Sequence, residues 1–213
     1  MMLNVLLTIC FATASHGSTS DDSPLRSATT IRTEHPDIAQ RVDGMQPIRN
    51  RAGSWYFPGT DLTHPLAQAL IKDRIRARLD DASIRVALVY ALEAENRFAW
   101  NEIQTEEPSV RVAMLHGYKS INTRESGIVL ANALQDDASS VRAEAARLVG
   151  YRQNAEGLAS SLMVGLTDPA EDVRRLAVRS LGWLQVQDAF EPVSALLEDA
   201  DPSVRVAAVR ALA

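Results

Sequence analysis

From residue 84 onward, apolar and polar residues recur in one short pattern, in which a branched apolar residue is followed by arginine. The apolar residues of the five copies are Ile84, Val110, Val141, Val173 and Val204. The steps between successive copies are 26, 31, 32 and 31 residues. A period of this length is the signature of stacked structural repeats, each of which buries its apolar face only against its neighbours.

Each copy begins an apolar stripe with helical spacing. After Val204, apolar residues follow at offsets of 3, 4, 7 and 8. These residues are Ala207, Ala208, Ala211 and Leu212. Such offsets lie on one face of an α-helix. Asp201-Pro202 and Asp168-Pro169 precede two of the copies, which predicts an N-capping Asp followed by a Pro in the first turn.

A second, less regular helix is expected before each of these helices. The expected ranges are residues 64–79, 93–104, 123–135, 155–167 and 189–199. Leu158, Leu162 and Leu166 step by four residues, as one buried helix face requires. The step of 26 residues is the shortest of the four, which predicts a compressed second pair that has lost its loop.

Composition divides the chain into three parts. Residues 1–14 are mostly apolar and end in Ala12-Thr13-Ala14, a cleavage pattern that predicts a signal peptide and a periplasmic or secreted protein. No Lys or Arg precedes the apolar run, so a misassigned start or an uncleaved anchor, with a cytoplasmic location, stays open. Residues 15–61 are rich in Ser, Thr, Gly and Pro and predict an irregular or disordered segment. Residues 62–213 hold the helical repeats.

One aromatic cluster stands out in the N-terminal segment. Trp55, Tyr56 and Phe57 are consecutive in a chain that is only 5% aromatic. These rings either cover the open end of the first repeat, which a stack of repeats needs, or form an adhesive segment for a partner.

Charge and composition exclude several kinds of chemistry. The net charge is −5 with no basic patch, which disfavours a nucleic-acid partner. The single cysteine, Cys10, allows no disulfide. The four histidines are not paired with acids at metal-ligand spacing, and neither a phosphate loop nor a serine elbow occurs. We therefore expect no catalytic residue, no metal site, no cofactor and no transmembrane segment in the mature chain.

The motif Asp-Pro-x-Val-Arg-x-x-Ala, clearest in residues 201–208, resembles the HEAT repeat, and more narrowly the HEAT-like repeats named after phycobilisome lyases. The resemblance covers residues 62–213 and implies an all-α fold, a right-handed α-solenoid of about five HEAT-like helix pairs. It also implies that the capping Asp and the arginine after the Val form a structural ladder between repeats. The arginines of this ladder are Arg85, Arg111, Arg142, Arg174 and Arg205.

Enzymes built on such repeats carry signatures that this chain lacks. Deoxyhypusine hydroxylase has repeated His-Glu pairs for iron, and no His-Glu dipeptide occurs here. The HEAT-like alkylpurine glycosylases use a basic groove, whereas this chain is acidic. We therefore favour a binding role over an enzymatic one.

The sixth residue after each repeated apolar position lies away from the core stripe. These five residues are Tyr90, His116, Arg147, Arg179 and Arg210. The row is either a solvated face or a recognition stripe on the inner surface, because Tyr and Arg are favoured at binding hot spots. As a recognition stripe it would bind an acidic protein surface, in a manner weakened by salt.

The last helix is apolar nearly all round, and the sequence stops on it at Ala213 without a polar cap. Terminal repeats normally need such a cap, so we expect either a truncated reading frame or a partner that covers this end. The predicted function is an exported, non-catalytic protein-interaction scaffold. The alternatives are a lyase-like or chaperone-like subunit that assists a cofactor protein, and a piece of a larger HEAT-repeat protein.

Overall fold

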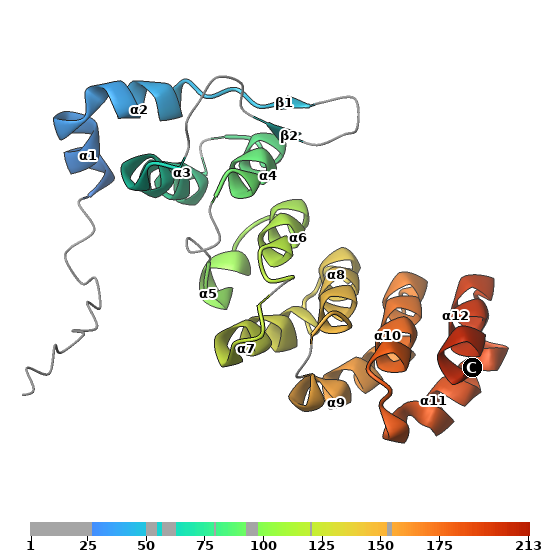
Figure 1. The fold of residues 1–213 in the computed structure, drawn as a ribbon. Helices are drawn as coiled ribbons and strands as arrows, with labels where there is room; N and C mark the ends of the chain where they lie inside the picture. Colours follow the sequence, from blue (N-terminus) through green and yellow to red (C-terminus); the bar gives the residue numbers. More distant parts are fainter. Residues whose placement is uncertain are drawn as a thin grey trace, which may run out of the picture.

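Paired helices stack in two layers along a curved path in the computed structural model of the chain (Figure 1). The structure describes residues 27–49, 55–56, 63–78, 80–92, 98–119, 121–152 and 155–213. The predicted signal peptide and the rings of Trp55, Tyr56 and Phe57 lie outside what is described.

The inner layer contains the helices that begin at the repeated motif. They are α4 (Ala82–Tyr90), α6 (Pro108–His116), α8 (Ser139–Val149), α10 (Glu171–Trp183) and α12 (Pro202–Leu212). The outer layer contains α5 (Trp100–Ile103), α7 (Arg124–Ala133), α9 (Glu156–Val164) and α11 (Phe190–Ala195). Short 3-10 turns, η1 (Gly165–Thr167), η2 (Gln187–Ala189) and η3 (Leu196–Glu198), adjoin α9 and α11.

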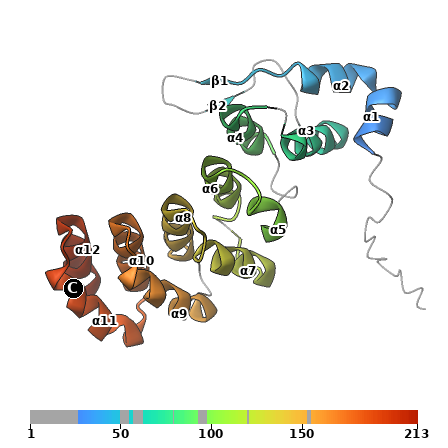
Figure 2. The same cartoon turned by 180° about the vertical axis from the view of Figure 1, so that it is seen from behind.

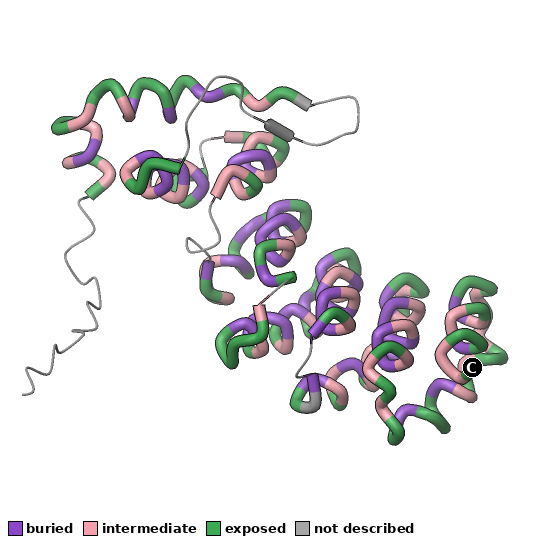
Figure 3. The backbone as a smooth tube through the Cα atoms, in the orientation of Figure 1, coloured by how far each residue is buried: buried purple, intermediate pink, exposed green. Residues whose placement is uncertain are grey.

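Both views show successive inner-layer helices side by side, with the inner layer on the concave side of the curve (Figures 1 and 2). Buried residues follow the facing sides of the two layers (Figure 3). Val110, Val141, Val173 and Val204 are almost completely buried, as their place in the repeated motif predicts. The expected all-α solenoid of HEAT-like helix pairs is thereby confirmed.

Close helix contact requires glycine at one point in the inner layer. A Cβ on Gly182 of α10 would lie 2.7 Å from the Cβ of Ala211 on α12. The missing side chain therefore lets these two helices approach each other closely. Small residues at this crossing form the floor of a groove described below.

The observed N-termini of two helices correct one prediction made from the sequence. The Asp201 carboxylate caps α12 by accepting from the backbone N–H groups of Ser203 and Val204 at 2.8 and 3.3 Å. Asp168 does not cap α10 in this way, because that helix begins at Glu171 with Ala170 as its N-cap. Asp168 lies one turn earlier, and the Ala170 N–H donates to its carboxylate at 2.9 Å.

The second helix pair, which has the shortest period, contains a short first helix. The sequence predicts a helix over 93–104, whereas the described part of this range contains only α5, four residues long. The Glu102 carboxylate accepts from the Ala99 N–H at 3.0 Å and so stabilises the start of this turn. Among the described residues, the first helix of this pair is therefore shorter than α7, α9 and α11, and the loss of a loop stays a prediction.

The segment before the solenoid is more regular than its composition predicts. It contains α1 (Ala28–Glu34), α2 (Pro36–Asp43) and a short antiparallel pair, β1 (Ile48–Arg49) with β2 (Trp55–Tyr56). Both helices pack on α3 (Pro65–Ala77), and Arg32 of α1 joins Asp43 and Asp73 at 3.1 and 3.0 Å. The prediction of an irregular segment is wrong for these residues, because the helices are too short to show a period and form by packing on α3.

Candidate functional site

A ladder of arginines and acids joins consecutive repeats at the motif. The Nε and Nη2 atoms of Arg142 donate to the two carboxylate oxygens of Asp168 in the next repeat, at 2.7 and 2.9 Å. Its Nη1 atom donates to the backbone oxygens of Asp136 and Asp137, at 2.7 and 2.9 Å. One guanidinium therefore fastens the loop of its own repeat to the loop of the following repeat.

The same arrangement recurs along the stack. Each acid accepts the arginine of the preceding repeat on its carboxylate and the arginine of its own repeat on its backbone oxygen. The further rungs are Arg85 with Glu106, Arg111 with Asp136, and Arg174 with Asp199, at 3.2, 2.7 and 2.8 Å. The ladder acid is thus four or five residues before the motif's apolar residue, whereas the capping acid Asp201 is a different residue.

The two ends of the ladder differ from its middle. At the start, Arg74 of α3 pairs with both oxygens of Asp80 at 2.7 and 2.9 Å. The repeated motif did not predict this ion pair, because Arg74 lies in the first helix of its pair and the motif lies in the second. At the other end, Arg205 donates to the backbone oxygens of Asp199 and Ala200 at 2.7 and 3.0 Å. No carboxylate among the described residues forms an ion pair with Arg205.

The ladder lowers the pKa values of two of its acids, Asp168 and Asp199. Burial acts to raise the pKa of Asp168, but hydrogen bonds from Arg142 and the Ala170 N–H outweigh it, and the pKa lies below its usual value. The Arg174 hydrogen bonds likewise hold the pKa of Asp199 below its usual range. These acids are therefore charged partners with a structural role.

The predicted row of five residues lies on the inner layer, one residue on each helix. The rings of Tyr90 and His116 meet edge to face with centroids 5.9 Å apart. The Nε2 atom of His116 lies 3.3 Å from the Glu144 carboxylate, which also accepts from Nε of Arg147 at 2.8 Å. Glu144 therefore links His116 to Arg147, and the ring contact links Tyr90 to His116.

Aromatic rings continue the row toward the C-terminal repeats. The Arg147 guanidinium lies over the Tyr151 ring at 5.5 Å, and the Tyr151 and Trp183 rings are 5.4 Å apart. The Arg179 guanidinium in turn lies over the Trp183 ring at 4.8 Å. Trp183 is 52% exposed. Two guanidinium groups, Arg147 of α8 and Arg179 of α10, thus flank a pair of contacting rings, each in cation–π contact with one ring.

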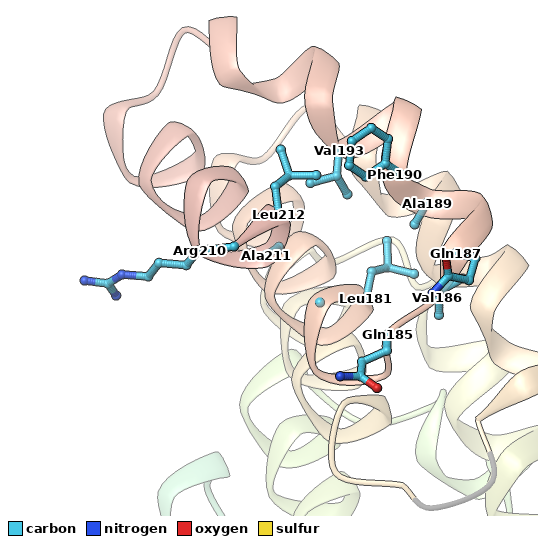
Figure 4. A pocket seen from close by; sticks show the side chains of 12 residues that line it. Leu181, Gln185, Val186, Gln187, Ala189, Phe190, Val193, Arg210, Ala211 and Leu212 are labelled. Carbon is cyan, nitrogen blue, oxygen red and sulfur yellow. The ribbon is translucent and has the colours of Figure 1, made fainter.

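A groove of about 630 Å³ lies between α10 and α12, at the end of this row. Its charged lining consists of Arg175, Arg179 and Arg210, and Trp183 forms part of its wall. A second hollow of about 400 Å³ lies between the end of α10, α11 and the end of α12. Arg210 points away from the apolar side chains of that hollow (Figure 4).

Comparison with known families agrees with this geometry. Residues 159–213 match the family described as HEAT repeats. The C-terminal repeats are therefore similar to HEAT repeats. No curated protein matches the chain, and the narrower phycobilisome-lyase type stays a prediction.

Two residues of the inner-layer row, Tyr151 and Trp183, were missed in the sequence although a signal for them exists. Tyr151 and Trp183 each lie ten residues after the repeated valine of their motif, one helical turn beyond Arg147 and Arg179. Glu144 was missed because its position holds Ala in three of the other copies and Leu in the fourth. Only the structure places this nearly buried carboxylate between His116 and Arg147.

Two further properties of the described residues bear on their chemistry. Within the described residues, no helix has the length and apolar character needed to cross a membrane. The same residues contain no group of three or more metal-ligating side chains placed to hold an ion. HEAT repeats generally serve as scaffolds for protein–protein interaction, through the extended concave surface that stacking creates.

Proposed function

We propose that the chain is a non-catalytic scaffold that binds another protein along the inner helix layer. The observation that carries this proposal is the continuous row of aromatic and basic side chains, from Tyr90 on α4 to Arg179 on α10. Tyr, Trp and Arg are the residues most enriched at binding hot spots. A stack of helices presents them on a largely preformed surface, so that little ordering entropy opposes binding.

A photo-crosslinking amino acid tests which face binds. We would place it at Tyr90 on the inner layer and, as the control, at Ile128, which is equally exposed on α7 of the outer layer. Both variants would be expressed in the native host and irradiated. Discrete adducts from position 90 but not from position 128 are expected, whereas equal adducts from both positions would argue against an inner binding face.

We propose further that this scaffold is exported, on the strength of the Ala12-Thr13-Ala14 pattern. The intact mass of the protein from its native host tests this. A mass that corresponds to Ser15–Ala213 is expected, and a mass that includes Met1 or Met2 would contradict export.

The outward side of α12 supports an additional contact with a partner. Val209 is 58% exposed, whereas Leu115, Ala146 and Val178 at the same repeat position are buried. We therefore propose that another molecule covers this side. Wild-type protein should self-associate in sedimentation experiments and Val209→Glu should not, because a charge opposes apolar contact. A wild type that stays monomeric at high concentration would contradict this proposal.

A further inference from the structure

The groove between α10 and α12 differs from the rest of the inner layer in the state of its charges. Arg147 is paired with Glu144, and Arg175 with Asp172. Arg179 and Arg210 form no ion pair with any carboxylate of the described residues, and the Nε atom of Arg179 is buried without an acceptor. Two guanidinium groups at the same repeat position are thus available to an anionic ligand.

Apolar surface lies between these two cations. Gly182 on α10, and Val206, Ala207 and Ala211 on α12, line the groove together with Trp183. Val206 is 49% exposed and Trp183 is 52% exposed. The volume of about 630 Å³ lies within the range of sites that bury a ligand of several side chains. An ion alone would leave this apolar surface exposed to water.

We propose that this groove binds an acidic peptide segment of the partner protein, whose two carboxylates pair with Arg179 and Arg210 and flank an apolar side chain seated against Trp183. The inference rests on the proposed scaffold function and assigns the chemistry of its partner. Guanidinium and carboxylate groups form charge-assisted, often bidentate hydrogen bonds. The neighbouring apolar contact excludes water from these bonds and strengthens them.

The repeat geometry sets the spacing of the two carboxylates. Adjacent packed helices are about 8–10 Å apart, and Arg179 and Arg210 occupy equivalent positions on α10 and α12. On a helical ligand, residues i and i+7 are about 10.5 Å apart. On an extended ligand in the polyproline II conformation, which has three residues per turn, residues i and i+3 lie on one side and are about 9 Å apart.

A single-stranded nucleic acid is the competing occupant, since basic side chains and stacked rings also bind bases. The net charge of −5 and the Glu144 carboxylate in the row oppose a long polyanion. A peptide can place its few carboxylates at the two unpaired arginines alone. The observations therefore favour the peptide.

Fluorescence anisotropy with defined probes tests the proposal on the full chain. One labelled peptide would carry Glu at i and i+7 with Leu between them. A second labelled peptide would carry Asp at i and i+3 with Leu between them. Matched peptides would replace the acids by their amides, or Leu by Ser. Labelled oligo-dT would serve as the nucleic-acid probe. Binding of either acidic peptide, weakened by both replacements, is expected, and the better peptide identifies the ligand's conformation.

Variants of the protein locate the binding. Arg179→Glu, Arg210→Glu and Trp183→Ala should each weaken the acidic peptide about tenfold or more, as the loss of a hot-spot residue does. Arg124→Glu makes the same charge change on the exposed surface of α7 and should leave binding unchanged. Arg179→Gln repeats the test without charge reversal, and circular dichroism would show that each variant is folded.

Three results would overturn the proposal. They are equal binding of the acidic and amide peptides, equal loss in the α7 control, and binding of oligo-dT that is as tight as that of the peptides. The two hypotheses can fail separately. Adducts from position 90 without any peptide binding would reject only the groove, whereas peptide binding with adducts from both faces would reject only the extended inner surface.

Discussion

Removal of the Arg142 side chain tests whether the ladder holds the repeats together. Arg142→Met keeps much of the apolar stem but removes four hydrogen bonds, two to Asp168 and two to backbone oxygens. The Asp168 carboxylate is only 10% exposed, so that loss of its partner leaves a nearly buried negative charge.

The expected cost follows from this burial. Loss of one partner from a buried ion pair destabilises a protein by about 3–5 kcal/mol. The Ala170 N–H still donates to Asp168 at 2.9 Å, and we therefore expect a value near the lower end, about 3 kcal/mol. For a chain of this size, that change lowers the melting temperature by roughly 6–12 °C.

The measurement combines urea unfolding with amide hydrogen exchange, because repeat arrays can unfold in parts. Exchange should quicken in α8 and α10 before α4. Arg41→Ala is the control, since it breaks an exposed pair with Asp37 within one helix, worth about 0.3–0.5 kcal/mol. If Arg142→Met costs no more than Arg41→Ala, the ladder does not hold the repeats together and the reasoning is wrong.

Three further predictions concern the same C-terminal repeats. Arg205→Met should cost clearly less than Arg174→Met in urea unfolding, because Arg205 has no ion-pair partner among the described residues, and equal costs would contradict the ladder. The pKa of Asp199 is lower in the folded state than its usual 3.8, so the folded protein binds fewer protons than the unfolded chain. This contribution to stability is therefore present above pH 3.8 and lost as the pH falls further. Asp199→Asn should flatten the acid limb of a pH–stability curve, and an unchanged limb would count against the ion pair. Gly182→Val should destabilise by about 1–3 kcal/mol in thermal melts, because its side chain would collide with Ala211, whereas a neutral result would mean that α10 and α12 separate easily.

The sequence determined the repeat and most of its helices. The recurrence of the motif at Val141, Val173 and Val204 encodes helix pairs directly, because burial of one face per helix leaves a periodic apolar stripe. It also placed the row residues Arg147 and Arg179 on one side of the stack, since equal offsets in a repeat lie at equal positions.

The tertiary structure decided which charges are satisfied. Sequence alone treats Arg147, Arg179 and Arg210 as equivalent, but Glu144 pairs with the first of them and no carboxylate of the described residues pairs with the other two. The sequence likewise could not distinguish the ladder acid Asp199 from the capping acid Asp201, which lies two residues later. The short helices α1 and α2 also depend on their packing against α3. The pair of Asp199 with Arg174 and the packing of α1 and α2 on α3 join residues far apart in the sequence, so no local pattern along the chain records these neighbours. The Glu144–Arg147 pair lies within α8, but the burial of its carboxylate beside His116 depends on the neighbouring repeat.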